Sequence, residues 1–257
     1  MSELGQRIAE IRDRIEGAIA RSGRAPGAVL LVAVTKTFPA ATVVEAVREG
    51  LTVFGENRVQ EAASKIPEVA RLGRGGAEDA EGGSALAQPA ASETAGPRLS
   101  WHLIGHLQSN KAKIAAPLFD LVHSVDDVEL ARRLDAAAEA HGKLLSVLVQ
   151  VNVSGEASKS GVEPERLREL VDTVASLGSL DLRGLMTIPP WDLDADTARP
   201  HFAALRELGG KLGGWLGRPG CACELSMGMT DDFEVAIEEG ATIVRIGRAL
   251  FGDRPPR

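Results

Sequence analysis

The chain has 257 residues, of which 44% are hydrophobic and 25% charged, and its formal net charge is −7. This composition is that of an ordinary globular protein, and the length is typical of one α/β barrel of ~250 residues. A net negative charge argues against nucleic acid as the main partner, because a phosphate backbone requires a basic surface. The charged N-terminus lacks the apolar core of a signal peptide, and no run of ~18 apolar residues could span a membrane. We therefore expect a cytoplasmic protein without a membrane partner.

Eight apolar, β-branched segments separated by helical periodicity are the strongest structural signal. An amphipathic helix is predicted first, at roughly residues 3–21. The strands are then expected at 29–36, 53–57, 100–105, 121–126, 146–153, 182–189, 224–228 and 241–247. Helical spacing is found at 40–49, 128–140, 164–177, 198–212 and 232–239. Several of these helices end near a glycine, as helices often do: Gly50, Gly142, Gly178 and Gly240.

The strands predict a parallel sheet. Several are continuous apolar runs rather than alternating ones, which is typical of strands buried on both faces. An open, doubly wound sheet would usually begin with a glycine-rich dinucleotide turn, but the residues after the first strand read TKTFPA. We therefore predict one α/β domain over residues 1–257, a (β/α)8 TIM barrel with an extra N-terminal helix.

One stretch, residues 73–97, interrupts this pattern. It consists almost entirely of Gly, Ala, Ser, Pro and acidic residues. Such a composition buries too little apolar surface to offset the entropy lost on ordering. We expect a disordered surface insertion without a catalytic role, on the N-terminal side of the barrel.

Reactive groups in this fold come from the C-terminal ends of the strands, which makes Lys36 the first candidate. It ends the apolar run LLVAVTK, where partial desolvation would lower its pKa and increase the fraction of free amine. A free amine attacks an aldehyde to form a Schiff base. A lysine at a strand end can equally extend into solvent, and spacing alone does not separate the two interpretations.

The last two strands predict a phosphate site. Ser226 and Gly228 end the seventh strand, and Gly247 and Arg248 end the eighth. Loops after these two strands are the recurrent phosphate site of the fold, and glycine allows the backbone to approach an anion closely. Arg245 would keep a pyridine nitrogen unprotonated if it faced one, because a guanidinium does not release its proton. An ion pair with Glu224 is the structural alternative for Arg245.

Other polar residues stay unassigned. His102 lies within a predicted strand and is best interpreted as a hydrogen-bonded structural histidine, whereas His106 lies in the following loop. Cys221 and Cys223 are separated by one residue, too close for an ordinary structural disulfide, and no metal site is expected.

The sequence resembles the pyridoxal phosphate homeostasis proteins of the YggS/PROSC type. The similarity extends from about residue 5 to 252, interrupted by 73–97, and is carried by VAVTKTFP, FGENRVQE, WHLIGHLQSNK, HSVD, VQVNVSGEASKSGV, GLMTIPP and LSMGMTDDFEVAIEEGATIVRIGRALFG. It implies a fold-type III barrel similar to the N-terminal domain of alanine racemase, with pyridoxal 5′-phosphate as a Schiff base on Lys36. The implied cofactor-binding residues are Lys36, Asn57, Met186, Ser226, Gly228, Arg245, Gly247 and Arg248. Asn57 and Met186 would line the ring, Arg245 would lie near the pyridine nitrogen, and the other four would hold the phosphate.

The resemblance also limits the expected chemistry. Alanine racemase carries a catalytic tyrosine on an additional C-terminal domain, whereas this chain ends shortly after the eighth strand and contains no tyrosine. Racemisation needs proton delivery on both faces of a carbanion. We expect a protein that binds, buffers or delivers the cofactor, possible partners being apo-enzymes, as a monomer or weak dimer. A cofactor-dependent racemase or lyase is the main alternative, and a Schiff-base aldolase and a scaffold are others.

Overall fold

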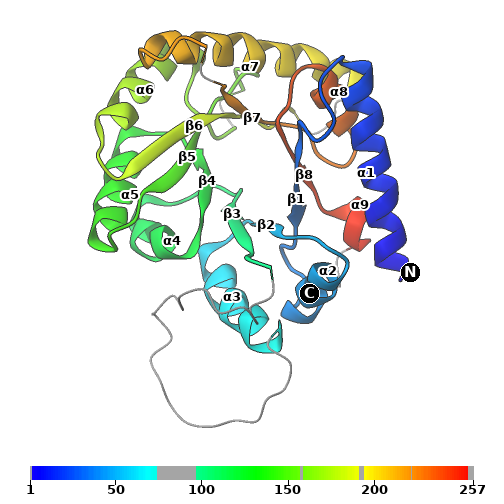
Figure 1. Cartoon of the computed structure of the whole chain (residues 1–257). Helices are drawn as coiled ribbons and strands as arrows, with labels where there is room; N and C mark the ends of the chain where they lie inside the picture. Colours follow the sequence, from blue (N-terminus) through cyan, green and yellow to red (C-terminus); the bar gives the residue numbers. More distant parts are fainter. Residues whose placement is uncertain (1, 74–96, 157–158, 191–193, 221, 254–257) are drawn as a thin grey trace, which may run out of the picture.

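The strands of the computed structural model close into one parallel barrel in sequence order, β1 through β8 (Figure 1). The structure describes residues 2–73, 97–156, 159–190, 194–220 and 222–253. The strands are β1 Leu30–Val34, β2 Val53–Glu56, β3 Ser100–Leu103, β4 Leu121–Val125, β5 Leu145–Gln150, β6 Leu180–Met186, β7 Glu224–Ser226 and β8 Ile243–Ile246. The ring closes because Ala33 of β1 lies opposite Phe54 of β2 on one side and Ile246 of β8 on the other.

The predicted barrel is confirmed, and most strands end two or three residues earlier than expected. Three residues that were predicted to end strands, Lys36, Asn57 and Gly247, lie in the loops that follow. The pattern of side chains does not change at the end of a strand, so the sequence does not show where the backbone hydrogen bonds between neighbouring strands stop. At β1, the last bond of this kind runs from the Thr35 N–H to the Gly55 carbonyl, at 3.0 Å.

Helices surround the barrel on the outside (Figure 1). They are α1 Glu3–Arg21, α2 Ala40–Arg48, α3 Val59–Gly73, α4 Ala112–Leu118, α5 Val128–Ala140, α6 Leu167–Ser176, α7 Ala195–Trp215, α8 Phe233–Glu238 and α9 Arg248–Phe251, with short 3-10 turns at Ser109–Lys111 and Pro164–Arg166. Apolar side chains on one face of each helix pack against the outward-facing strand residues and form a continuous core. The barrel interior holds a separate cluster of Val32, Leu121, Leu148, Met186 and Ile243.

The extra N-terminal helix was predicted with the correct bounds. Ser2 caps α1 by accepting a hydrogen bond from the Gly5 N–H at 2.9 Å. The apolar face, which includes Ile8, Ile11 and Ile15, is buried, and the helix packs beside α8 and α9 (Figure 1). The helix therefore covers the segment where β8 closes onto β1.

The loop between β7 and α8 differs from the expectation. β7 ends at Ser226, two residues before its predicted end, and α8 begins at Phe233, one residue after the predicted start at 232. The Asp232 carboxylate accepts the Met229 N–H at 2.6 Å and so holds residues 229–232 in a turn. The loop after β7 is therefore longer than predicted.

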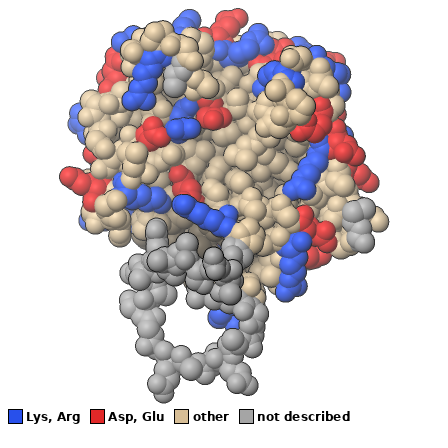
Figure 2. All heavy atoms as spheres, viewed as in Figure 1, with Lys and Arg blue, Asp and Glu red and all other residues tan. Residues whose placement is uncertain are grey.

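Two further expectations fall at the edges of the described structure. Gly73 ends α3 and the chain resumes at Pro97, so residues 74–96 of the predicted insertion lie outside the described residues. Cys223 Sγ donates to the Glu224 carbonyl at 3.6 Å, and Cys221 lies outside the described residues. Among the described helices, none is both long and apolar enough to cross a membrane. In Figure 2, acidic and basic side chains are interspersed, and no extended basic patch covers the described residues of this face.

Candidate functional site

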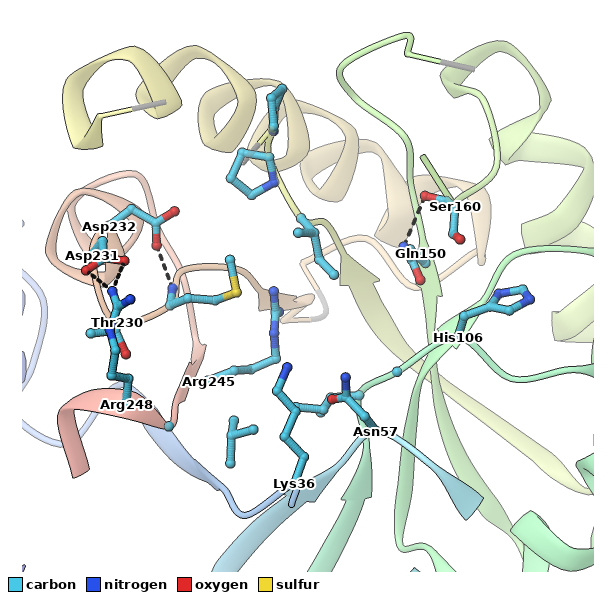
Figure 3. Close-up of a pocket in the computed structure, with 18 of the residues that line it drawn as sticks. Lys36, Asn57, His106, Gln150, Ser160, Thr230, Asp231, Asp232, Arg245 and Arg248 are labelled. Atoms are coloured by element: carbon cyan, nitrogen blue, oxygen red, sulfur yellow. Dashed lines mark hydrogen bonds and ion pairs between the residues drawn. The ribbon is translucent and has the colours of Figure 1, made fainter. Parts of the chain in front are cut away.

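A cavity of about 730 Å³ opens at the C-terminal ends of the strands. This is the end of the barrel where sites in this fold are built. Residues of several strand ends and loops contribute to its wall (Figure 3). Of the residues predicted from the sequence, those that line it are Lys36, Asn57, Arg245, Gly247 and Arg248.

Strand alternation directs Lys36 into this cavity. Side chains of a strand point alternately to its two faces, so Val32 and Val34 of β1 share the interior face. Thr35 still bonds to Gly55 of β2, and Lys36, which follows it, continues the alternation into the cavity. Val32 packs inside the barrel, and Val34 lines the cavity together with Lys36. In Figure 3 the half-buried Lys36 lies beside Arg245 and Asn57. Its amine is therefore at the floor of the cavity and not in open solvent.

Arg245 is the buried cation of the site, with 3% of its surface exposed. It donates to Ser226 Oγ at 2.6 Å and to the Thr187 carbonyl at 3.0 Å. Burial lowers the pKa of Arg245 to about 10, so the guanidinium remains charged at neutral pH. The alternative ion pair with Glu224 is not formed, since the Glu224 carboxylate accepts the Thr242 hydroxyl instead. Arg245 is thus fixed by neutral acceptors and faces the cavity.

A chain of buried hydrogen bonds extends from Arg245 into the barrel interior. Ser226 Oγ lies 2.8 Å from His123 Nδ1, and His123 Nε2 lies 3.0 Å from His102 Nδ1. His102 Nε2 in turn lies 3.1 Å from Ser100 Oγ. Because arginine can only donate hydrogen bonds, the Ser226 hydroxyl accepts one from Arg245 and can donate its own hydrogen to His123 Nδ1. We assign both histidines as neutral, with the proton on Nε2, so that each bond in the chain has one donor.

Burial supports the neutral assignment. It lowers the pKa of His102 to about 4, and burial together with His102 and Arg245 lowers the pKa of His123 well below its ordinary value. His102 is therefore a hydrogen-bonded structural histidine, in line with the sequence interpretation. His123 was missed, because a single histidine in an apolar strand gives no sign of which distant residues it will meet.

The neutral histidines predict an acid-sensitive contribution to stability. Between about pH 6.5 and pH 4, unfolded histidine takes up a proton that folded His102 does not. The free energy of unfolding should fall across this window, by on the order of 3 kcal/mol for His102. His102→Asn retains an acceptor for His123 and removes the titrating ring. We expect the variant to lose less stability than the wild type between these pH values.

Urea unfolding at several pH values measures this difference. The comparison must be made between the two proteins, because burial raises the pKa of Glu56, Asp126 and Asp232 and these carboxyls act in the opposite direction. Their contributions cancel in the difference between wild type and variant. Parallel pH profiles for the two proteins would contradict neutral burial of His102.

Three of the predicted residues lie behind the cavity wall. Ser226 is completely buried and bonded to Arg245 and His123, and Met186 is completely buried in the interior cluster. Gly228 has φ +92°, and a Cβ built on it would lie 2.6 Å from the Ala236 Cβ of α8. The need for glycine at 228 therefore comes from the packing of α8 and the backbone conformation.

The opposite side of the cavity contains residues that the sequence did not assign. Gln150 and Ser160 line it, and the Gln150 side-chain amide donates to the Ser160 carbonyl at 3.0 Å. His106 also lines it, with Nδ1 3.4 Å from the Asp126 carboxylate, and its ring points away from Lys36 in Figure 3. Charged residues line both sides of the cavity, since Lys159 precedes Ser160 on this side and Arg248 pairs with Asp231 on the other. In the described part of the chain, no cluster of three His, Cys, Asp or Glu residues could hold a metal ion.

Comparisons with known proteins assign the family. Residues 8–255 match the family model described as alanine racemase, N-terminal domain. A pyridoxal phosphate homeostasis protein of Pseudomonas aeruginosa is 45% identical over 254 residues, which is 99% of this chain and 97% of the relative. The protein of that name from Escherichia coli K12 is 39% identical over 99% of this chain and 98% of the relative. The chain belongs to the pyridoxal phosphate homeostasis protein family.

Solved structures agree with this family membership. The structure of PipY of Synechococcus elongatus, described as having PLP bound, is 36% identical in sequence to this chain. The two superpose with a TM-score of 0.78 over 97% of this chain and 100% of PipY. An alanine racemase of Clostridium difficile is only 14% identical, with a TM-score of 0.61 over 95% of this chain and 56% of that chain. The racemase likeness therefore concerns the barrel fold alone. The predicted resemblance to the homeostasis family is confirmed.

Proposed function

We propose that this homeostasis-family protein binds pyridoxal 5′-phosphate, attached covalently to Lys36, and buffers or delivers it. The observation that carries the proposal is the placement of Lys36 on the floor of a cavity beside the buried Arg245. The 36% identical PipY, whose structure is described with PLP bound, supports the same ligand here.

The residues of the cavity fit the groups of this cofactor. A volume of about 730 Å³ is within the range of small-molecule sites and leaves room beside one phosphorylated ring. Gly247 and Arg248 are available to the phosphate, although Arg248 pairs with Asp231 at 2.7 Å and an anion would compete for it. Asn57 lies next to Lys36 and could contact the ring. We propose that Ser226 and Gly228 act from behind the wall and that Met186 packs below the ring.

Each cavity residue has a defined chemical task in this proposal. Lys36 would hold the cofactor through Nζ, which as a neutral amine would bond to the aldehyde carbon with release of one water. When bound, pyridoxal phosphate supplies an electron-withdrawing ring that stabilises negative charge on an attached carbon. Arg245 limits that stabilisation, because a guanidinium at the ring nitrogen donates a hydrogen bond without transferring a proton. The arrangement favours holding the cofactor over carbanion chemistry.

We infer that the protein has no robust turnover of amino acids. The sequence contains no tyrosine to act as the second acid of a racemase. A racemase or lyase is the alternative function, and the observation that favours it is His106, which lines the cavity and pairs with Asp126 at 3.4 Å. We further propose apo-enzymes as recipients, a monomer or weak dimer as the working form and the cytoplasm as the location.

Absorption spectroscopy with peptide mapping tests the attachment. The protein is incubated with pyridoxal phosphate, its spectrum is recorded, and borohydride is added before proteolysis. We expect a visible absorption band that borohydride removes, and a reduced adduct on the peptide that contains Lys36. A protein that stays colourless after incubation would overturn the proposal.

A further inference from the structure

Three charged residues on the outer side of the barrel hold the backbone on both sides of Lys36. They are Glu56 at the end of β2 and Glu61 and Lys65 on α3, and are called the Lys65 cluster below. Lys65 Nζ donates to the Thr35 carbonyl at 2.7 Å, to Glu56 Oε1 at 2.7 Å and to Glu61 Oε1 at 2.8 Å. All three N–H groups of the Lys65 ammonium are therefore used, and one of them fixes the carbonyl of Thr35, the residue before Lys36.

The cluster is buried under α3. The side chains of Glu56, Lys65 and Glu61 are 0%, 6% and 25% exposed. Thr35 Oγ1 donates to Glu56 Oε1 at 2.7 Å, which adds a second bond to the residue before Lys36. Charges at such depth are costly to bury, so each of them depends on its bonds to the others. Removal of one partner would leave the others in place but incompletely bonded.

The residue after Lys36 is held by the same cluster. The Thr37 N–H donates to Glu61 Oε1 at 2.6 Å. Thr37 has φ +70°, and among the described residues it is the one non-glycine residue with a positive φ. The left-handed region is unfavourable for a β-branched residue, so this conformation needs an external restraint. The Thr37 hydroxyl does not supply one, because Thr37 Oγ1 is buried without a hydrogen bond to the described residues.

We propose that Glu61 and Lys65 are positioning residues for Lys36. They act from outside the barrel through the Thr35 carbonyl and the Thr37 N–H, and they fix the backbone so that the Lys36 amine points into the cavity. A displacement of a reacting atom by about 1 Å can slow a reaction by about a hundredfold, so this restraint should control the rate of attachment. The inference rests on the proposed function, because it concerns the bond between Lys36 and the cofactor aldehyde.

Glu61→Ala tests the inference with little risk to folding. Alanine favours the helix, and Lys65 keeps its bonds to Glu56 and the Thr35 carbonyl. Rapid mixing of apo-protein with pyridoxal phosphate, followed by the visible band, gives the rate of attachment. We expect that rate to fall by about tenfold or more in Glu61→Ala. Glu61→Gln, which keeps an oxygen acceptor for the Thr37 N–H, should recover most of it. Glu68→Ala, an exposed position of the same helix, is the matched control and should behave as the wild type.

A second ligand separates positioning from general damage to the site. Pyridoxine 5′-phosphate has an alcohol in place of the aldehyde and cannot bond covalently to Lys36. We expect its dissociation constant in Glu61→Ala to stay within about threefold of the wild type, because Glu61 does not line the cavity. Equal losses for both ligands would show a structural role and overturn the inference.

The positive φ of Thr37 allows a second, independent test of the inference. Glycine adopts positive φ readily and keeps the backbone N–H. The double variant Glu61→Ala, Thr37→Gly should therefore attach pyridoxal phosphate faster than Glu61→Ala alone. A double variant no faster than the single variant, or a Glu61→Ala rate equal to that of Glu68→Ala, would overturn the inference and leave the proposed function intact. A wild type that forms no covalent adduct would overturn both.

Discussion

Lys36→Ala is expected to abolish covalent attachment of pyridoxal phosphate. Lys36 is the lysine that strand alternation and the preceding Val34 direct onto the cavity floor, and the bond to the aldehyde requires its amine. Mass spectrometry after borohydride should show one adduct on the wild type and none on the variant. Lys113→Ala, at an exposed position of α4, should retain the adduct and controls for the loss of a lysine.

Lys36→Arg distinguishes loss of the bond from loss of the site. A guanidinium does not deprotonate and forms no imine, yet it preserves the positive charge at the cavity floor. We expect this variant to bind pyridoxal phosphate without attaching it, as measured by equilibrium dialysis before and after borohydride. An adduct of wild-type stoichiometry on either Lys36 variant would place the attachment elsewhere in the chain.

The same variants decide between the carrier and the enzyme. Under the carrier proposal, wild-type protein loaded with cofactor shows no appreciable conversion of added amino acids. Turnover of an amino acid by the pure wild type that disappears in Lys36→Ala would favour the racemase or lyase. His106→Ala would then show whether the pair with Asp126 delivers the proton.

Gly228→Ala is expected to produce the second largest effect, a loss of stability of about 3 kcal/mol or more. A Cβ at this position would lie 2.6 Å from the Ala236 Cβ and 2.9 Å from the Phe233 Cα, and φ +92° is unfavourable for alanine. The first turns of α8 would have to move away from β7. Because the Gly228 carbonyl accepts the Arg245 N–H at 3.0 Å, the displacement should reach the cavity wall.

Urea unfolding and cofactor binding measure the two consequences. Gly214→Ala is the matched control: it lies within α7, and a Cβ there meets no atom within 4 Å. That substitution should be neutral or stabilising by up to about 1 kcal/mol, as alanine is in a helix interior. Equal unfolding midpoints for the two variants would contradict the packing explanation of Gly228.

The lining of the cavity was only partly predictable from the sequence. Lys36, Arg245 and Gly247 were predicted and line the cavity, because each lies at or just beyond the end of an apolar strand in a fold whose strand ends meet at one face. Ser226 and Gly228 were predicted on the same rule, and the structure places both behind the wall. The rule locates a residue near the correct end of the barrel but does not give its depth or its direction.

The barrel, its strand order and the N-terminal helix were determined by the sequence alone, because local periodicity and apolar runs report which face of each segment is buried. The sequence marked Lys36 as a candidate but left open whether its amine extends into solvent, and the structure places it in the cavity. Only the tertiary structure decided what joins distant segments. His123 meets Ser226 across 103 positions, and Lys65 reaches the Thr35 carbonyl across 30. Such contacts depend on packing distances between elements, which no local pattern of side chains encodes.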